Sequence, residues 1–175
     1  MRNYIFICFI ATILTACAQN PGSNKTNIKS EQKIRKQATA IAENFVKEKL
    51  KAPAKNVTNT GLIIYSEGDT KCLVDPSYIV IGEIDEDSFK DAIVTIYTME
   101  GQRLPLKEHL ILLNKNGKLS ISKELTGEMR FLKIEDRTIF IETSHVAPDS
   151  PFADCQICKE IKKYKYVAGD TVRIK

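Results

Sequence analysis

The hydrophobic residues follow two different periods along this chain, one before Pro53 and another after it. Before Pro53 they recur every three or four positions, which places them on one stripe of an α-helix. The members of the stripe are Ile34, Ala38, Ile41, Ala42, Phe45, Val46 and Leu50. Ser30 can cap the start of this helix, and Pro53 cannot continue it. Because the stripe is rich in alanine and has no tryptophan, it predicts a helix that packs on a sheet rather than one that lies on a membrane.

After Pro53 the helical period disappears, and short apolar runs alternate with turn residues. The runs predict strands at 61–66, 70–74, 78–83, 92–97, 108–114, 119–123, 130–134, 138–143, 159–167 and 171–174. Asn116-Gly117 is the strongest hairpin signal, because both residues accept the positive φ of a type I′ turn.

Three of the runs do not alternate: 79–81 and 93–96 consist of consecutive β-branched residues, and 110–113 is continuously apolar. A strand of this kind is buried on both faces. We therefore expect 79–81 and 93–96 to pair at the centre of a sheet, with 110–113 as a third covered strand. The sequence predicts an α+β domain in which an N-terminal amphipathic helix packs on a curved antiparallel β-meander of about 7–10 short strands.

Residues 1–16 have the composition of an export signal. Arg2 supplies the positive region, and residues 5–13 form an apolar core shorter than the roughly 20 residues that a spanning helix needs. Residues 14–17, Leu-Thr-Ala-Cys, are similar to the lipobox of bacterial lipoproteins, in which cleavage before the cysteine leaves it lipidated. We expect a lipid on Cys17 to anchor the chain in a membrane. An ordinary signal peptide or an uncleaved anchor is the alternative.

Residues 17–29 are polar and predict a flexible tether, which leaves residues 30–175 as a single domain. The tether lacks the acidic cluster that follows the cysteine in surface lipoproteins of some anaerobes, which favours a periplasm-facing protein of the bacterial envelope. Loss of residues 1–16 removes Arg2 and lowers the net charge from +4 to +3. So small an excess, in a chain with 27% charged residues, argues against nucleic-acid binding.

An acidic loop, residues 83–91, separates two of the apolar strands. Glu83, Asp85, Asp87 and Asp91 place carboxylates at alternate positions, and the backbone carbonyl of Phe89 would add another oxygen. Calcium takes six to eight oxygen ligands, and a curled loop turns every second side chain inward. The pattern favours a solvated acidic turn that has lost its metal, with a calcium site at these five positions as the alternative. Flanking strands exclude an EF-hand.

The loop resembles the D-x-D-x-D-G-x-x-D calcium loop of FG-GAP and VCBS-type β units. The segments LLNKNGK at 112–118 and TSHVAPD at 143–149 follow it, in the order found in small exported bacterial proteins that look like a single such unit. The resemblance covers residues 77–174 and implies a strand–loop–strand calcium unit. Three positions depart from the pattern. Glu83 replaces aspartate, Phe89 replaces a polar residue, and Ser88 replaces glycine, where a left-handed conformation costs roughly 1–2 kcal/mol.

The cysteines offer a second candidate site. Cys8 leaves with the signal and Cys17 takes the lipid, so Cys72, Cys155 and Cys158 remain. An exported protein meets an oxidising compartment, and a disulfide is expected, either Cys155–Cys158 or one of these with Cys72. Free thiols, or half of a zinc site near His145, are the alternatives.

The histidines complete the candidate chemistry. His109 is expected at the end of a strand, and His145 lies in a loop where it could meet Asp149, but no nucleophile motif accompanies either. The sequence predicts a lipid-anchored, non-enzymatic accessory or binding protein of the envelope with an unidentified partner. An exported enzyme or inhibitor with a site in residues 136–158 is the alternative.

Overall fold

The computed structural model describes residues 22–144 and 158–174, with side chains from residue 28 onward. These residues form one α-helix, a 3-10 turn and two sets of strands. The elements are α1 (Gly22–Lys49), β1 (Ala54–Val57), β2 (Ile63–Glu67), β3 (Thr70–Val74), η1 (Pro76–Tyr78), β4 (Val80–Gly82), β5 (Asp91–Glu100), β6 (Leu106–Lys115), β7 (Lys118–Thr126), β8 (Met129–Glu135), β9 (Thr138–Ser144), β10 (Lys159–Val167) and β11 (Asp170–Ile174).

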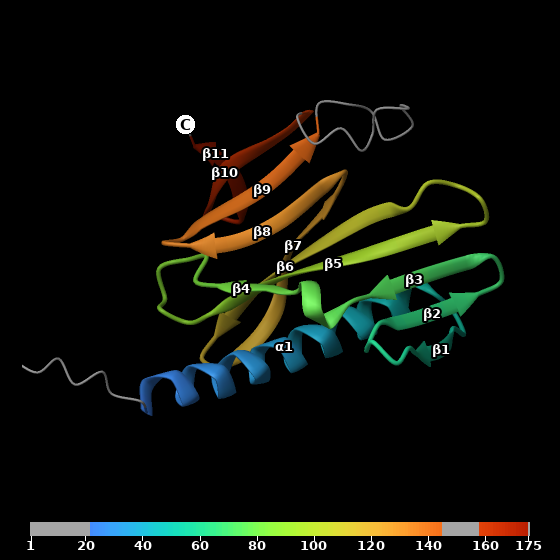
Figure 1. The fold of residues 1–175 in the computed structure, drawn as a ribbon, viewed down its shortest axis with the longest axis horizontal. Helices are drawn as coiled ribbons and strands as arrows, with labels where there is room; N and C mark the ends of the chain where they lie inside the picture. Colours follow the sequence, from blue (N-terminus) through green and yellow to red (C-terminus); the bar gives the residue numbers. More distant parts are fainter. Residues whose placement is uncertain (1–21, 145–157, 175) are drawn as a thin grey trace, which may run out of the picture.

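A large sheet lies between α1 and a smaller sheet (Figure 1). The large sheet has seven strands in the order β1-β2-β3-β5-β6-β7, with β4 also paired to β5. The small sheet has four strands in the order β11-β10-β9-β8, and the pairing is antiparallel in both sheets. The α+β class is confirmed. The expected single meander is wrong, because the chain changes sheets after β7.

Two hydrophobic cores occupy the two faces of the large sheet. On one face Val94 and Leu110 join a core that includes the apolar stripe of α1. On the other face Ile93 and Ile111 join a core that includes Phe131, Ile139 and Ile141 of the small sheet. Successive side chains of a strand point to opposite faces, so one continuous apolar run supplies both cores. The prediction that these strands are covered on both faces is confirmed, and the small sheet is the cover that the sequence left unidentified.

The two apolar strands that flank the acidic loop form a hairpin. Val80 pairs with Ile93 and Gly82 with Asp91, which confirms the expected pairing of β4 with β5. However, β4 is short and occupies only the first part of one edge of β5, because β3 pairs with the remainder of that edge from Ile96 onward. β4 is therefore an edge strand, and β5 and β6 form the centre of the sheet.

Gly82 is a point of close approach between the two sheets. A Cβ atom built on Gly82 would lie 2.5 Å from Cβ of Ile134 on β8 and 3.0 Å from its carbonyl oxygen. Real Cβ atoms do not approach so closely, so glycine is required here by the crossing of β4 and β8. Gly82, which immediately precedes the acidic loop, therefore allows β4 to pack closely against β8, and the loop motif alone does not predict this role.

The turn and helix boundaries show one agreement and one difference. Asn116 and Gly117 have φ of 56° and 86°, as expected for the two central residues of the β6–β7 hairpin. The helix begins at Gly22 rather than at Ser30, so it includes residues 22–29, which the sequence assigns to the tether. Within the described residues no helix has the length and apolar content needed to cross a membrane. Residues 1–16 and Cys17 lie outside them.

Candidate functional site

The acidic loop contains two successive Asx turns, in which an aspartate side chain accepts a hydrogen bond from the backbone N–H two residues later. Asp85 accepts a hydrogen bond from the backbone N–H of Asp87 at 3.2 Å, and Asp87 accepts one from the N–H of Phe89 at 3.0 Å. Ser88 has φ of 63°, the left-handed conformation expected at a position that glycine usually holds. The alternation of the carboxylates therefore curls the loop, as the sequence predicts.

A lysine ammonium lies between two of the expected calcium ligands. Nζ of Lys115 is 2.5 Å from Oδ2 of Asp85 and 2.9 Å from Oδ2 of Asp87. The hydrogen bond with Asp85, followed by that with Asp87, raises the pKa of Lys115, so it stays charged at all physiological pH values. Lys115 comes from the end of β6, immediately before the Asn116-Gly117 turn. The chain thus supplies its own cation to these carboxylates.

Asp91, the last expected calcium ligand, is fully buried and holds backbone groups from two elements. Its Oδ2 accepts a hydrogen bond from the N–H of Ile84 at 2.7 Å, and its Oδ1 accepts one from the N–H of Asn114 at 2.8 Å. Burial raises the pKa of Asp91 to about 6, although both hydrogen bonds oppose the shift. Asp91 therefore ties the start of the acidic loop to the end of β6.

The five expected calcium-ligand positions lie on one loop but do not share one centre. Asp85 and Asp87 contact Lys115, and Asp91 contacts the backbone. Glu83 lines a shallow surface pocket together with Glu86 and Arg137, and the Phe89 side chain is exposed. Over the ranges that the structure describes, no three His, Cys, Asp or Glu side chains are grouped as metal ligands.

The cysteines divide into one free thiol and one disulfide-bonded residue. Cys72 is a free thiol buried in the core beneath α1, with its Sγ 3.5 Å from Oγ1 of Thr98. Cys158 is disulfide-bonded. The alternative of a disulfide to Cys72 is therefore wrong, because the Cys72 thiol is free and its side chain is buried in the core between β3 and α1. Cys155, His145 and Asp149 lie outside the described residues.

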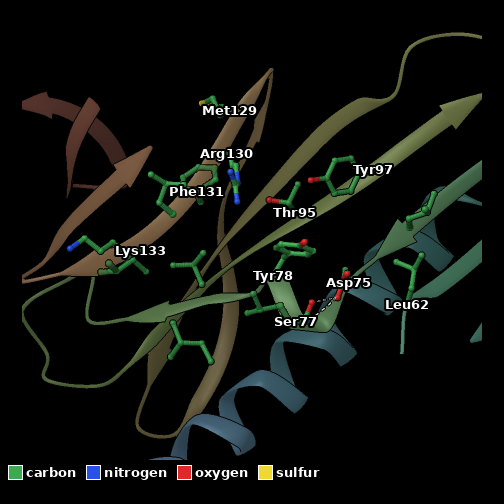
Figure 2. Close-up of a pocket in the computed structure, with 16 residues that line it drawn as sticks. Leu62, Asp75, Ser77, Tyr78, Thr95, Tyr97, Met129, Arg130, Phe131 and Lys133 are labelled. Carbon is green, nitrogen blue, oxygen red and sulfur yellow. Dashed lines mark hydrogen bonds between the residues drawn. The ribbon is translucent and has the colours of Figure 1, made fainter. Parts of the chain in front are cut away.

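A cleft between the two sheets is a further candidate site, which the hydrophobic pattern of the sequence does not predict. It encloses about 620 Å³ and lies between residues 77–81 on one wall and residues 129–134 on the other. Thr95 and Tyr97 of β5 form its floor (Figure 2). We call it the interlayer cleft. Its volume is in the range of ligand-binding pockets.

Aromatic and cationic side chains flank the interlayer cleft from both sides. Tyr78 of η1 is 64% exposed, and Figure 2 shows it across from Arg130 and Phe131 of β8. The side chain of Arg130 is 62% exposed, and its Nη1 lies 3.7 Å from Oε1 of Glu142. An exposed tyrosine and an exposed arginine are residue types that commonly anchor partners at interfaces.

Arg35 of α1 holds the wall that contains Tyr78. Its Nη1 donates hydrogen bonds to the carbonyl oxygens of Pro76 at 2.5 Å and Ile79 at 3.0 Å, with a longer contact to that of Ser77. Asp75 caps η1 by accepting from the N–H and the hydroxyl of Ser77. The wall is thus positioned by polar contacts from the helix layer.

His109 lies inside β6, beside the floor residue Thr95 on the neighbouring strand, and not at a strand end as expected. Its Nε2 is 3.1 Å from the carbonyl oxygen of Gly127, which can only accept, so Nε2 carries a proton. Burial lowers the pKa of His109, and the neutral ring then accepts at Nδ1 from the hydroxyl of Thr95, 3.0 Å away. The edge of the ring also contacts Phe131 at a centroid distance of 4.9 Å. His109 therefore fixes two residues that line the cleft.

Comparison of the chain with protein-family models, with curated proteins and with solved structures gives no match in any of the three.

Proposed function

We propose that this chain is a lipid-anchored accessory or binding protein of the bacterial envelope, that it performs no catalysis of its own, and that it binds in the interlayer cleft. The anchor is Cys17, in the Leu-Thr-Ala-Cys segment that follows a short apolar stretch. The observation that carries the binding role is the cleft itself, an open cavity of about 620 Å³ with an exposed tyrosine and an exposed arginine on opposite walls.

The reactive side chains nearest the cleft support binding over catalysis. Both ring nitrogens of His109 are engaged, one by Thr95 and one by a backbone carbonyl. The carboxylate of Asp75 caps η1, and Cys72 is buried on the helix side of the large sheet. A general base or nucleophile needs a free position next to the reacting atom, and each of these groups already has a structural contact.

The acidic loop supports a structural role for its carboxylates. Lys115 neutralises Asp85 and Asp87, and Asp91 joins the loop to β6. In this proposal the loop stabilises the β4–β5 hairpin, whose other side forms a cleft wall. Calcium is then a competitor of Lys115 for the same oxygens rather than a required cofactor.

Site-specific photo-crosslinking in intact cells tests the binding role. A photoreactive amino acid replaces Tyr78 at the cleft or, as a matched control, Val57, which is 53% exposed on β1. We expect one discrete adduct from position 78 and none of the same mass from position 57. The same adduct from both positions, or adducts only from position 57, would refute binding in the cleft. Metabolic labelling with an alkyne fatty acid tests the anchor, since Cys17→Ser should abolish the label.

A further inference from the structure

The hydroxyl of Thr95, on the floor of the interlayer cleft, can only accept hydrogen bonds from an occupant. Burial lowers the pKa of His109, so its ring is neutral, and Nε2 donates the one ring hydrogen to the carbonyl oxygen of Gly127. Nδ1 therefore accepts the single hydrogen of the Thr95 hydroxyl over 3.0 Å. The lone pairs of Thr95 remain for the cleft, and they require a ligand that donates.

Two tyrosines supply flat apolar surface and hydroxyl groups in the same space. Tyr78 is 64% exposed on one wall, and Tyr97 is half-buried on the floor. Figure 2 shows Tyr78 extending from η1 toward Thr95 and Tyr97. Among the contacts of the described residues, neither tyrosine hydroxyl has a hydrogen-bond partner. Each tyrosine thus offers a ring face for apolar contact and a hydroxyl that can donate or accept.

The cations that line the cleft already have partners on the small sheet. Nζ of Lys133 lies 2.5 Å from Oε2 of Glu135 and 4.7 Å from the ring centre of Phe140. Nη1 of Arg130 lies 3.7 Å from Oε1 of Glu142. Phe140 and Glu142 alternate with the core residues of β9, so they stand on the face that points away from the large sheet. An anionic ligand in the cleft would meet no unpaired cation, which favours a neutral ligand.

The remaining lining residues add acceptors and apolar surface. Oδ1 of Asp75 accepts from the N–H of Ser77 at 2.9 Å and from its hydroxyl at 2.6 Å. A carboxylate has about four acceptor positions, so Asp75 can accept further hydrogen bonds after capping η1. Leu62, Leu73 and Met129 supply apolar side chains. The cleft therefore suits a neutral ligand that has both hydrogen-bond donors and a flat apolar surface.

We propose that this ligand is a neutral sugar, bound in the interlayer cleft as a short stretch of glycan. The inference rests on the proposed function and names the chemical class of the ligand. A sugar ring carries several hydroxyl groups, which can donate to Thr95 and Asp75 and can accept from Tyr97. Its C–H bonds form an apolar surface that fits the electron-rich ring face of Tyr78. A purely apolar ligand would leave the acceptors without donors.

The test uses the full lipidated chain in micelles of a detergent without a sugar headgroup. The probes are maltotriose, cellotriose and the trimer of N-acetylglucosamine, with choline as a cation that also binds aromatic rings. Saturation-transfer difference NMR over a concentration series measures each affinity. Tyr97→Phe removes only a hydroxyl from the site, and Tyr78→Ala removes an exposed ring. Tyr166→Phe is the matched control, because its hydroxyl lies 2.6 Å from Oγ of Ser122, outside the cleft.

We expect at least one trisaccharide to bind. Tyr78→Ala should weaken its binding at least about tenfold, Tyr97→Phe should weaken it about two- to tenfold, and Tyr166→Phe should leave it unchanged. Equal binding by all four proteins would place the sugar outside the cleft and would overturn the inference, as would tighter binding of choline than of any trisaccharide.

Failure of all three trisaccharides to bind would also overturn the sugar ligand. If position 78 still gave its discrete photo-crosslinked adduct in that case, the proposed function would stand, and the occupant would be of another class, such as a protein segment. Loss of the adduct would refute binding in the cleft altogether. The two results therefore separate failure of this inference from failure of the proposed function.

Discussion

Asp91 provides the sharpest test of the structure, because it is a fully buried carboxylate with a pKa of about 6 against an ordinary value of 3.8. The folded state therefore binds this proton more tightly than the unfolded state does. The stability contributed by protonated Asp91 is fully present below pH 3.8 and is lost as pH rises through 6. One pKa unit corresponds to 1.36 kcal/mol, so the loss reaches at most about 3 kcal/mol at neutral pH.

Asp91→Asn isolates this effect, because asparagine has the same shape and does not titrate. Its amide oxygen can accept from only one of the N–H groups of Ile84 and Asn114, which costs about 1–3 kcal/mol at every pH. The pH-dependent part is the difference between the two proteins. Wild-type stability minus that of Asp91→Asn should fall by up to about 3 kcal/mol between pH 4 and pH 7.

Urea unfolding of the full chain in detergent micelles, followed by tyrosine fluorescence at several pH values, measures this difference. Glu43 and Asp170 have lowered pKa values and give the opposite slope, but they are present in both proteins and cancel. A difference that stays constant from pH 4 to pH 7 would refute the argument, since it would mean that Asp91 titrates alike in the folded and unfolded chains.

Three further predictions follow from the contacts described above. Gly82→Ala should cost about 1–3 kcal/mol by forcing β4 away from Ile134, and in urea unfolding this cost should be smaller in a chain that also carries Ile134→Gly, which removes the clashing Cβ atom. Lys115→Gln leaves two carboxylates without their cation, so millimolar calcium should raise the melting temperature of this variant more than that of the wild type; equal shifts would count against competition. Arg35→Met removes the donor to the carbonyl oxygens of Pro76 and Ile79 and should speed amide exchange in residues 77–79 while leaving β10 unchanged; unaltered exchange would show that Arg35 does not hold this wall.

The centre of the large sheet was readable from the sequence because its signal is local. A continuous apolar run such as 110–113 predicts that both faces of its strand are buried, and Asn116-Gly117 predicts the position of the hairpin turn. The left-handed conformation of Ser88 was likewise inferred from one position in one loop. These features depend on neighbours within a few residues.

The features that escaped prediction depend on residues far apart in the chain. Lys115 reaches Asp85 across 30 positions, and no spacing rule connects them. The strand β1 (Ala54–Val57) is fully exposed and has no apolar pattern, so only its pairing with β2 reveals it. The interlayer cleft is lined by residues 77–81 and 129–134, which are about 50 positions apart in the chain, and their approach cannot be read from a pattern of apolar residues.

The division into two sheets also determines the order in which parts of the chain can fold. Every strand of the large sheet precedes Gly127 in the chain, and every strand of the small sheet follows it. A chain that emerges from its N-terminus can thus complete the helix and the large sheet while the face bearing Ile93 and Ile111 is still bare. Until β8–β11 cover it, that apolar face is exposed to solvent. A chain truncated after β7 would therefore keep the face exposed and should be prone to aggregation.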